Sequence, residues 1–235
     1  MGGEFVVSHL KCGHCGNELP VMGRFITFQC ETCFRYWILT SGGLEPLQVR
    51  RAQVPADTDG EILLLPFWVI PLDGDRLRDS VEGSMTALLS EIAHTRVVPS
   101  GGELDVILRR IEQRGTYNIF IPAFQSANTF AYLKIGRLLT SRQPKFSATR
   151  HETPGQPVMC VLKPEDAVHL MDFVFIATLP ESLQRNGGFL ENVHLEPSAP
   201  PRFVEFPFIR KSMALTSIYG DFEISLRLIE SPEQE

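Results

Sequence analysis

The chain has 235 residues, of which 43% are hydrophobic and 21% are charged; this balance is typical of globular proteins and excludes a largely disordered chain. The formal net charge of −6 argues against a generic nucleic-acid binder with a strongly basic surface. The longest apolar run, Ile62 to Leu72, contains two prolines and is too short to cross a bilayer. Because the N-terminus lacks a basic segment followed by an apolar one, we expect no export signal and a cytoplasmic protein.

Four of the five cysteines form two C-x2-C pairs, Cys12 with Cys15 and Cys30 with Cys33. Two thiolates three positions apart on a tight turn point to one side, so two such turns supply the four ligands of a tetrahedral site. A thioredoxin-like redox pair is the alternative, but it needs one pair that opens a helix, and strand-like residues follow both pairs here. The sequence therefore predicts a structural Zn2+ held by four thiolates, with no coordination position left for catalysis.

Residues 8–47 resemble a zinc ribbon of the rubredoxin or transcription-factor-B type. The resemblance rests on two knuckles and two strands: Cys12-Gly-His-Cys15-Gly16, Arg24–Phe28, Cys30-Glu-Thr-Cys33 and Tyr36–Leu39. Ribbons usually have glycine after the second knuckle, where it permits a left-handed turn and lets backbone amides reach a thiolate, but this chain has Phe34. This departure weakens a redox-iron interpretation more than the zinc interpretation. The remainder is loosely similar to uncharacterised bacterial zinc-ribbon proteins, a likeness that implies no activity.

Three other residues, His14, Cys160 and His169, carry side chains that can be reactive. His14 lies inside the first knuckle, where a fifth ligand would be redundant, so we expect it to be solvated. Cys160 lies in an apolar run and is expected to be a buried small side chain, not a nucleophile. His169 shares one side of a predicted helix with Glu165 and Asp172; this spacing suits either a weak metal or proton-relay cluster or a solvated polar face.

A turn-rich segment at 55–60 divides the chain into two predicted units. Residues 1–54 contain the ribbon and a following strand over 47–54, and residues 60–230 form a larger body. The patterns of the body predict strands over 62–71, 117–121, 158–162, 203–206, 213–218 and 222–229, and helices over 75–94, 103–113, 129–141 and 164–178. Together these elements predict an α+β fold, with a mixed α/β arrangement as the alternative.

Three of the predicted strands share an apolar segment that is interrupted by proline and followed by an aromatic residue. They are Leu64–Trp68, Phe120–Phe124 and Glu205–Phe208. Proline lacks a backbone donor, so within a sheet it belongs at an edge, a bulge or a strand end. The three strands either end on one rim, where Trp68, Phe124 and Phe208 bind a partner, or pack these aromatic rings into the core. A degenerate internal repeat would also account for the similarity.

Charge is distributed unevenly along the chain. Residues 113–151 carry six basic and no acidic side chains, and the segments on both sides are acidic. Lys134 and Arg137 lie three positions apart on one face of a predicted helix. Such a stretch can pair with the acidic parts of its own chain, with an acidic partner protein or with a nucleic acid.

The sequence contains no phosphate-binding loop, no dinucleotide-binding glycine motif, no G-x-S-x-G elbow and no H-E-x2-H helix. The leading hypothesis is a non-catalytic zinc-ribbon adaptor or assembly subunit that binds other proteins, with self-association through strand edges as a variant. The second is a nucleic-acid-binding or transcription-associated factor, which the ribbon resemblance and the basic stretch favour and the net charge disfavours. The third is an enzyme whose site is assembled across the body.

Overall fold

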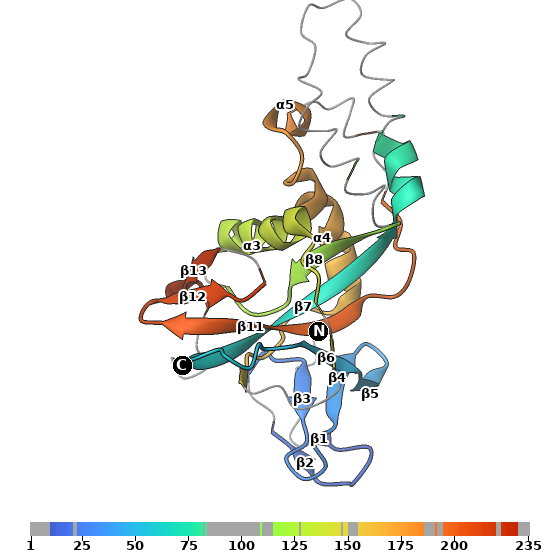
Figure 1. Ribbon diagram of the computed structural model, residues 1–235. Helices are drawn as coiled ribbons and strands as arrows, with labels where there is room; N and C mark the ends of the chain where they lie inside the picture. Colours follow the sequence, from blue (N-terminus) through green and yellow to red (C-terminus); the bar gives the residue numbers. More distant parts are fainter. Residues whose placement is uncertain are drawn as a thin grey trace, which may run out of the picture.

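The computed structural model describes the following residues: 10–20, 23–81, 83, 109, 115–126, 128–146, 148–149, 155–185, 191, 195–219 and 222–229. Figure 1 shows an α+β protein in which a small ribbon, residues 10–47, projects at the end of the molecule away from the helices. The predicted fold class and the N-terminal four-cysteine unit are confirmed. Residues 49–52 belong to the large sheet of the second unit. From here on, the body therefore means the described residues from 49 onward, and no longer residues 60–230.

The ribbon consists of two small antiparallel sheets. In the first, β1 (Leu10–Lys11) pairs with β2 (Glu18–Leu19). In the second, β4 (Tyr36–Thr40) lies between β3 (Thr27–Gln29) and β5 (Gly43–Leu47). The predicted strand after the second knuckle is therefore β4.

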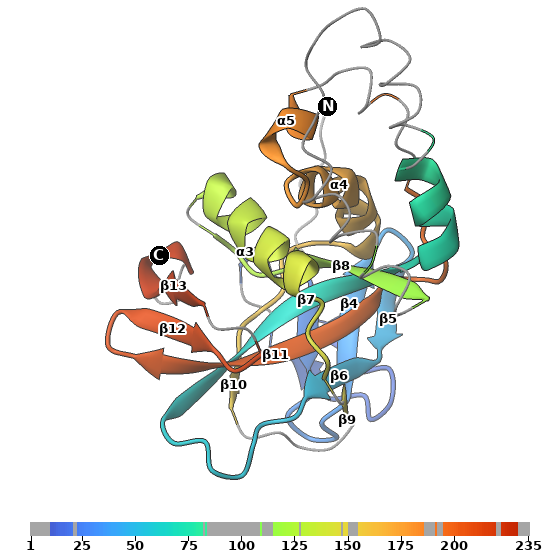
Figure 2. The same ribbon diagram turned by 45° about the horizontal axis from the view of Figure 1, so that its top comes forward.

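The body is built on a sheet that has eight strands among the described residues. They are β6 (Val49–Ala52), β7 (Glu61–Asp73), β8 (Thr116–Pro122), β9 (Ala148–Thr149), β10 (Gln156–Pro157), β11 (Arg202–Lys211), β12 (Ala214–Ser217) and β13 (Glu223–Ser225). The long strands β7 and β11 run antiparallel, side by side, across the molecule (Figure 2). One edge of β7 pairs with β8 and β10, and the outer edge of β11 pairs with β6 and β12. The strand expected to follow the ribbon, β6, thus lies in the sheet of the body.

Two prolines of the long strands, Pro66 and Pro207, occupy gaps between neighbouring strands, whereas Pro71 lies opposite Asn118 within the ladder of β7 and β8. Pro66 lies between the residues of β7 that pair with β10 and those that pair with β8, and its carbonyl accepts a hydrogen bond from Ala123 N at 2.9 Å. Pro207 lies between the residues of β11 that pair with β6 and those that pair with β12. The N–H and C=O groups of one strand residue point to the same edge of the strand. Proline has no N–H, but no neighbouring strand lies directly opposite it in the gap, so no carbonyl of a neighbouring strand is left without a donor.

The described helices of the body are α3 (Thr129–Arg142), α4 (Pro164–Ile176) and α5 (Glu181–Gln184), together with residues 74–81 and a 3-10 turn, η1 (Leu226–Leu228). Pro164 occupies the start of α4, where the first amides of a helix have no partner within it. Gly136 brings α3 against β8, because a Cβ at this position would lie 2.9 Å from Phe120 O.

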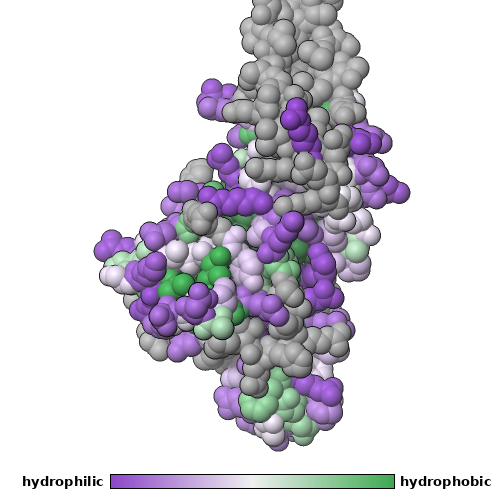
Figure 3. All heavy atoms as spheres, viewed as in Figure 1, coloured by the Kyte–Doolittle hydropathy of each residue, from purple (hydrophilic) through white to green (hydrophobic). Residues whose placement is uncertain are grey.

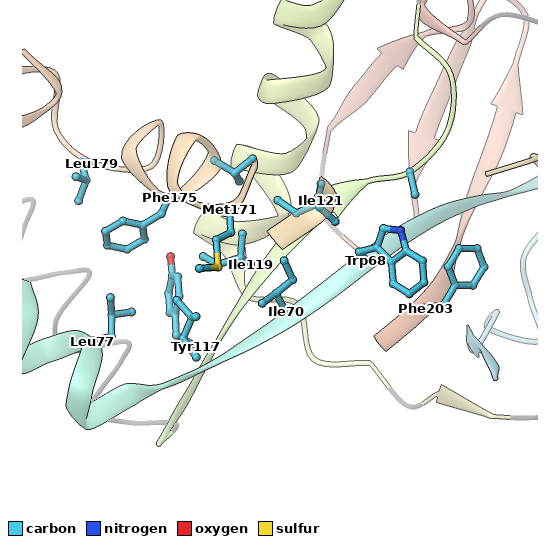
Figure 4. Close-up of a cluster of buried hydrophobic side chains, with 14 of the residues drawn as sticks. Trp68, Ile70, Leu77, Tyr117, Ile119, Ile121, Met171, Phe175, Leu179 and Phe203 are labelled. Atoms are coloured by element: carbon cyan, nitrogen blue, oxygen red, sulfur yellow. The ribbon is translucent and has the colours of Figure 1, made fainter. Parts of the chain in front are cut away.

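Successive residues of β7 point to opposite faces of the sheet and feed two clusters of buried side chains. Figure 4 shows the first cluster, in which Tyr117 and Ile119 of β8 face Met171 and Phe175 of α4. The second cluster joins β7 and β11 to α3 and to the hairpin of β12 and β13. Its aromatic rings meet edge to face, as in the pair Phe67 and Phe206 with centroids 5.5 Å apart.

The side chains of Thr140 in α3 and of Gln143, which directly follows this helix, cap the backbone of β8 along the edge that faces α3. Thr140 Oγ1 accepts from Phe120 N at 3.0 Å. The amide of Gln143 accepts from Asn118 N at 3.0 Å and donates to Asn118 O at 2.6 Å, as a neighbouring strand would. Gln143 is buried and has φ 47°, so it both ends α3 in the left-handed conformation and covers a strand edge.

Replacing Gln143 with glycine is expected to destabilise the protein by about 2–3 kcal/mol, measured by urea unfolding. Glycine relieves a left-handed backbone that costs about 1–2 kcal/mol, but it removes the hydrogen bonds to the partly buried N and O of Asn118 and to the buried carbonyl of Thr140, at about 1–2 kcal/mol each. Gln143→Asn, which suits the left-handed conformation but has a shorter reach, should lose a similar amount. A glycine variant more stable than the parent would show that backbone strain outweighs the edge cap.

Most of the other predicted strands and helices of the body are present in the structure. Strands 62–71 and 117–121 and helices 129–141 and 164–178 correspond to β7, β8, α3 and α4, and the last two predicted strands fall on the hairpin of β12 and β13. The strand expected over 158–162 is wrong: the ladder ends at Pro157, and Cys160 forms an isolated bridge with Phe124. Helix 75–94 is described only at its start and helix 103–113 only at residue 109. Within the described residues, no helix has the length and apolar content to cross a membrane.

Candidate metal centre

The first knuckle is a tight turn closed by backbone hydrogen bonds around Cys12. Gly16 N donates to Cys12 O at 2.8 Å, and Cys12 N donates to Asn17 O at 2.7 Å. Gly16 has φ 76°, a left-handed conformation that glycine adopts at little cost.

The second knuckle repeats this geometry around Cys30. Phe34 N donates to Cys30 O at 2.8 Å, and Cys30 N donates to Arg35 O at 2.9 Å. Phe34, which occupies the position of Gly16, has φ 56°. The departure from glycine therefore does not prevent the left-handed turn; the chain makes the turn with a bulky residue in a costly conformation.

The two knuckles bring the four predicted ligands together. The Sγ atoms of Cys12 and Cys33 are 3.5 Å apart, as are those of Cys15 and Cys30, and all four lie within 4.8 Å of one another. A tetrahedron with Zn–S bonds of about 2.3 Å has edges of about 3.8 Å, so the set fits a four-coordinate ion. These separations are far longer than a disulfide bond of about 2.05 Å.

Backbone amides favour ionisation of the first cysteine in each knuckle. Burial disfavours the Cys12 thiolate, but hydrogen bonds from the amides of Cys15 and His14 lower the pKa of Cys12 to about 6. The amide of Cys33 lowers the pKa of Cys30 in the same way, although burial opposes it. Each knuckle thus prepares one sulfur as a thiolate ligand.

The second cysteine of each knuckle behaves in the opposite way. The amide of Arg35 lowers the pKa of Cys33, but burial and the neighbouring Cys12 sulfur outweigh it and raise this pKa to about 12. The amide of Asn17 likewise fails to offset burial and the adjacent thiols at Cys15, whose pKa is raised. Four thiolates so close together therefore require a cation to ionise fully, which is what a divalent metal supplies.

The ring of Trp37 packs directly on the first knuckle. A Cβ at Gly13 would lie 2.6 Å from Cη2 and 3.0 Å from Cζ3 of Trp37. Trp37 belongs to the small buried cluster of the ribbon, and within the described part of the chain no acceptor reaches its Nε1. Only glycine allows this approach of the knuckle to the ring.

Gly13→Ala is expected to weaken zinc binding about tenfold, because overpacking of this kind costs about 1–3 kcal/mol and each 1.4 kcal/mol is a factor of ten. Titration against a competing chelator measures the effect. Gly83→Ala is the matched control: among the described residues no atom lies within 4 Å of its Cβ position, and Gly83 lies outside the ribbon, so zinc affinity should not change. An unchanged affinity in Gly13→Ala would mean that Trp37 moves aside freely.

Phe34→Gly is expected to strengthen zinc binding by roughly threefold. The left-handed conformation of Phe34 costs about 1–2 kcal/mol, and glycine would remove this cost. Glycine also loses more chain entropy on folding, which offsets about 0.5–1 kcal/mol of the improvement. Phe34 is 65% exposed, so removal of its ring loses little packing. Phe34→Ala separates the two effects in the same chelator titration, because it removes the ring and keeps the backbone cost; a gain as large as that of glycine would contradict the explanation.

The exposed surface of the ribbon around the knuckles carries both charged and apolar residues, such as Glu31, Arg35 and Phe34. Figure 3 shows a hydrophobic patch at the tip of the ribbon, flanked by hydrophilic residues. Cys15 and Phe34 are both exposed. His14 is exposed and lies outside the ligand group, as expected. The ligand group that the described residues form consists of the four cysteines, and His169, Glu165 and Asp172 lie on the exposed side of α4.

The proposed partner surface of three aromatic residues is wrong. Trp68, Phe124 and Phe208 are at most 3% exposed. Trp68 lies on β7, Phe208 on the neighbouring β11, and Phe124 just after β8, so the rings pack against the two faces of one sheet. Trp68 Nε1 donates to Leu162 O at 2.7 Å, and Phe208 packs against Phe222 with centroids 5.9 Å apart. Loss of these side chains would therefore disrupt folding first.

Lys134 and Arg137 lie on the exposed face of α3, where Figure 3 shows hydrophilic residues. Among the described residues no carboxylate forms an ion pair with either of them. Internal pairing, the simplest explanation of the basic stretch, is thus not seen for these two cations.

A buried ion pair at the junction of ribbon and body was missed by the sequence analysis. Arg51 Nε of β6 donates to Glu205 Oε2 of β11 at 2.6 Å, and Arg51 Nη2 donates to the hydroxyl of Tyr36 on β4. Burial raises the pKa of Glu205, and the Arg51 guanidinium only partly offsets this effect. A single carboxylate inside an apolar strand, as in Phe203–Phe208, is the sequence signal for such a pair.

Cys160 is fully buried, and burial raises its pKa to about 12. A thiol in this state is not a nucleophile, in agreement with its assignment as a core residue.

Comparisons with family models, with curated proteins and with solved structures find no match to this chain.

Proposed function

We propose that this protein is a non-catalytic zinc-ribbon adaptor or assembly subunit of a multiprotein complex. The observation that supports this proposal is the convergence of four cysteine sulfurs, all within 4.8 Å of one another. An ion held by four thiolates has no position for water or substrate and serves to hold the fold. Zinc is the ion we propose because two C-x2-C turns that supply four thiolates are typical of structural zinc sites, and the reduced thiols suit a cytoplasmic protein.

The attachment of the ribbon to the body suits an adaptor. Tyr36 of the ribbon contacts Arg51 of the body, and Ile38 belongs to the main buried cluster of the body. Surfaces on the two parts are therefore held in a fixed relation, so two partners bound to them would be held in a defined geometry.

Two measurements test this proposal. Elemental analysis of the purified full chain should give one zinc per chain, and native mass spectrometry after gentle isolation from its source cell should show it in a stoichiometric complex with other subunits. A metal-free protein would contradict the zinc site. A strictly monomeric protein with zinc and no retained partner would contradict the adaptor role.

A nucleic-acid-binding function is the second candidate, favoured by the exposed Lys134 and Arg137 on α3. It predicts oligonucleotide binding that weakens steeply between 50 and 200 mM salt, measured by fluorescence anisotropy. The double variant Lys134→Glu/Arg137→Glu should abolish this binding and leave zinc content unchanged. An affinity that this variant retains would contradict a role for α3.

A further inference from the structure

The ribbon has too few buried residues to hold its own fold. Its buried cluster consists of Cys12, Leu19, Phe28, Cys30 and Trp37, so two of five members are metal ligands. Units of about forty residues with so little core depend on a metal or on other staples. The order of β3 and β4 therefore depends on the occupied four-cysteine site.

The strands that cover the metal site also cover the body. Phe28 and Trp37 are paired across β3 and β4 and belong to the ribbon cluster. The next pair, Thr27 and Ile38, faces the opposite side, because successive strand residues alternate. Ile38 is buried in the main cluster of the body, so one step along the ladder connects the metal site to the core of the body.

On the side that faces the body, β3 and the residue before it form hydrogen bonds with the segment around Cys160. Ile26 N donates to Cys160 O at 3.0 Å, and Cys160 N donates to Thr27 Oγ1 at 3.4 Å. Cys160 also forms a bridge with Phe124, so its backbone lies between the ribbon and the segment that follows β8. Its thiol donates to Leu162 O at 3.4 Å and has no exposed surface. The ribbon therefore forms one wall of the Cys160 environment.

We infer that the ribbon is a metal-held clamp: the occupied four-cysteine site keeps β3 and β4 docked on the body, and loss of the ion releases them and uncovers Cys160. This inference rests on the zinc site of the proposed function. It adds that zinc occupancy controls the exposure of Cys160, which lies on the opposite side of β3 and β4 from the metal site. The sheet of the body stays folded in both states.

The Cys160 thiol reports the state of this clamp. In the docked state it is buried and its pKa is raised to about 12, so alkylation should be very slow. Release of the ribbon returns it toward the ordinary value of about 8.5, and the thiolate fraction rises about tenfold for each unit. We expect alkylation of Cys160 to accelerate by at least about a hundredfold when zinc is removed.

The experiment compares the full chain with and without zinc under reducing conditions. N-ethylmaleimide is added in short pulses, the peptide that contains Cys160 is quantified by mass spectrometry, and zinc is measured in the same samples. Hydrogen exchange of β7 and β8 amides, such as those of Ile70 and Ile119, shows whether the body remains folded. Fast labelling of Cys160 with retained amide protection supports the clamp.

A second variant tests the clamp with the metal still bound. Thr27→Val removes the acceptor of Cys160 N and should accelerate labelling several-fold at full zinc occupancy. Thr216→Val is the matched control, because the Thr216 hydroxyl donates to Glu223 on the exposed hairpin of β12 and β13; it should not change Cys160 labelling.

The other outcomes contradict specific parts of the inference. A Cys160 that stays protected after zinc removal overturns the clamp and leaves the zinc site intact. Simultaneous loss of protection at Cys160 and at β7 and β8 also overturns it, because the body then unfolds with the ribbon. A purified chain without zinc contradicts the proposed metal itself.

Discussion

Replacing Cys30 with serine is expected to remove zinc from the protein and to unfold the ribbon. Cys30 is fully buried and supplies one of four thiolates, and a serine hydroxyl at neutral pH does not replace a thiolate. Zinc contributes about 10–16 kcal/mol in small zinc-binding peptides, far more than the small ribbon cluster provides. Elemental analysis after dialysis against a mild chelator should find one zinc in the parent and almost none in the variant.

The matched control is Cys160→Ser, the same change at the cysteine outside the ligand group. It should keep one zinc per chain, although a buried hydroxyl costs the body stability. Stoichiometric zinc in Cys30→Ser would show that the four-thiolate site is not the metal site. Loss of zinc in both variants would make the effect one of general unfolding.

Replacing Arg51 with methionine is expected to destabilise the protein by about 3–5 kcal/mol at pH 7, measured by urea unfolding. The change leaves the Glu205 carboxylate buried without its partner, and the side chain of Glu205 is only 3% exposed. It also removes the contact with Tyr36, so the junction between ribbon and body weakens. Glu205→Gln should cost less, because the remaining Arg51 guanidinium is 15% exposed.

Two further measurements distinguish a lost ion pair from lost packing. Arg51→Met/Glu205→Leu should recover most of the stability, because no unpaired charge remains. Arg51→Met should also gain stability as the pH falls from 7 toward 5. The pKa of Glu205 is already raised by burial and rises further without Arg51. In this pH range the folded state therefore binds a proton that the unfolded state does not bind. A loss that is independent of pH and persists in the double variant would contradict this explanation.

The metal site was predictable because its signal is local. The spacing of Cys12, Cys15, Cys30 and Cys33 alone specifies two turns, and the structure brings all four sulfurs together. Helices α3 and α4 were also predictable, since apolar periodicity and the proline at the start of α4 act within one segment.

What escaped prediction depends on contacts between distant parts of the chain. Glu205 is 154 residues from Arg51, and Cys160 is 133 residues from Thr27, so no local pattern connects them. The burial of Trp68, Phe124 and Phe208 follows from the order β8, β7, β11, which a sequence of apolar strands does not encode. Gln143 reads as an ordinary polar residue after a helix until β8 is placed beside it.

The gaps that hold Pro66 and Pro207 have a consequence for how the body assembles. If β12 slid along β11 toward β6, Pro207 would enter the ladder and leave a carbonyl of the sliding strand without a donor. The same holds for β8 if it slid along β7 past Pro66 toward β10. Pro66 and Pro207 thus disfavour a shifted register of β8 and β12. As a result, the edge of each long strand pairs with two different strands, one on each side of the proline.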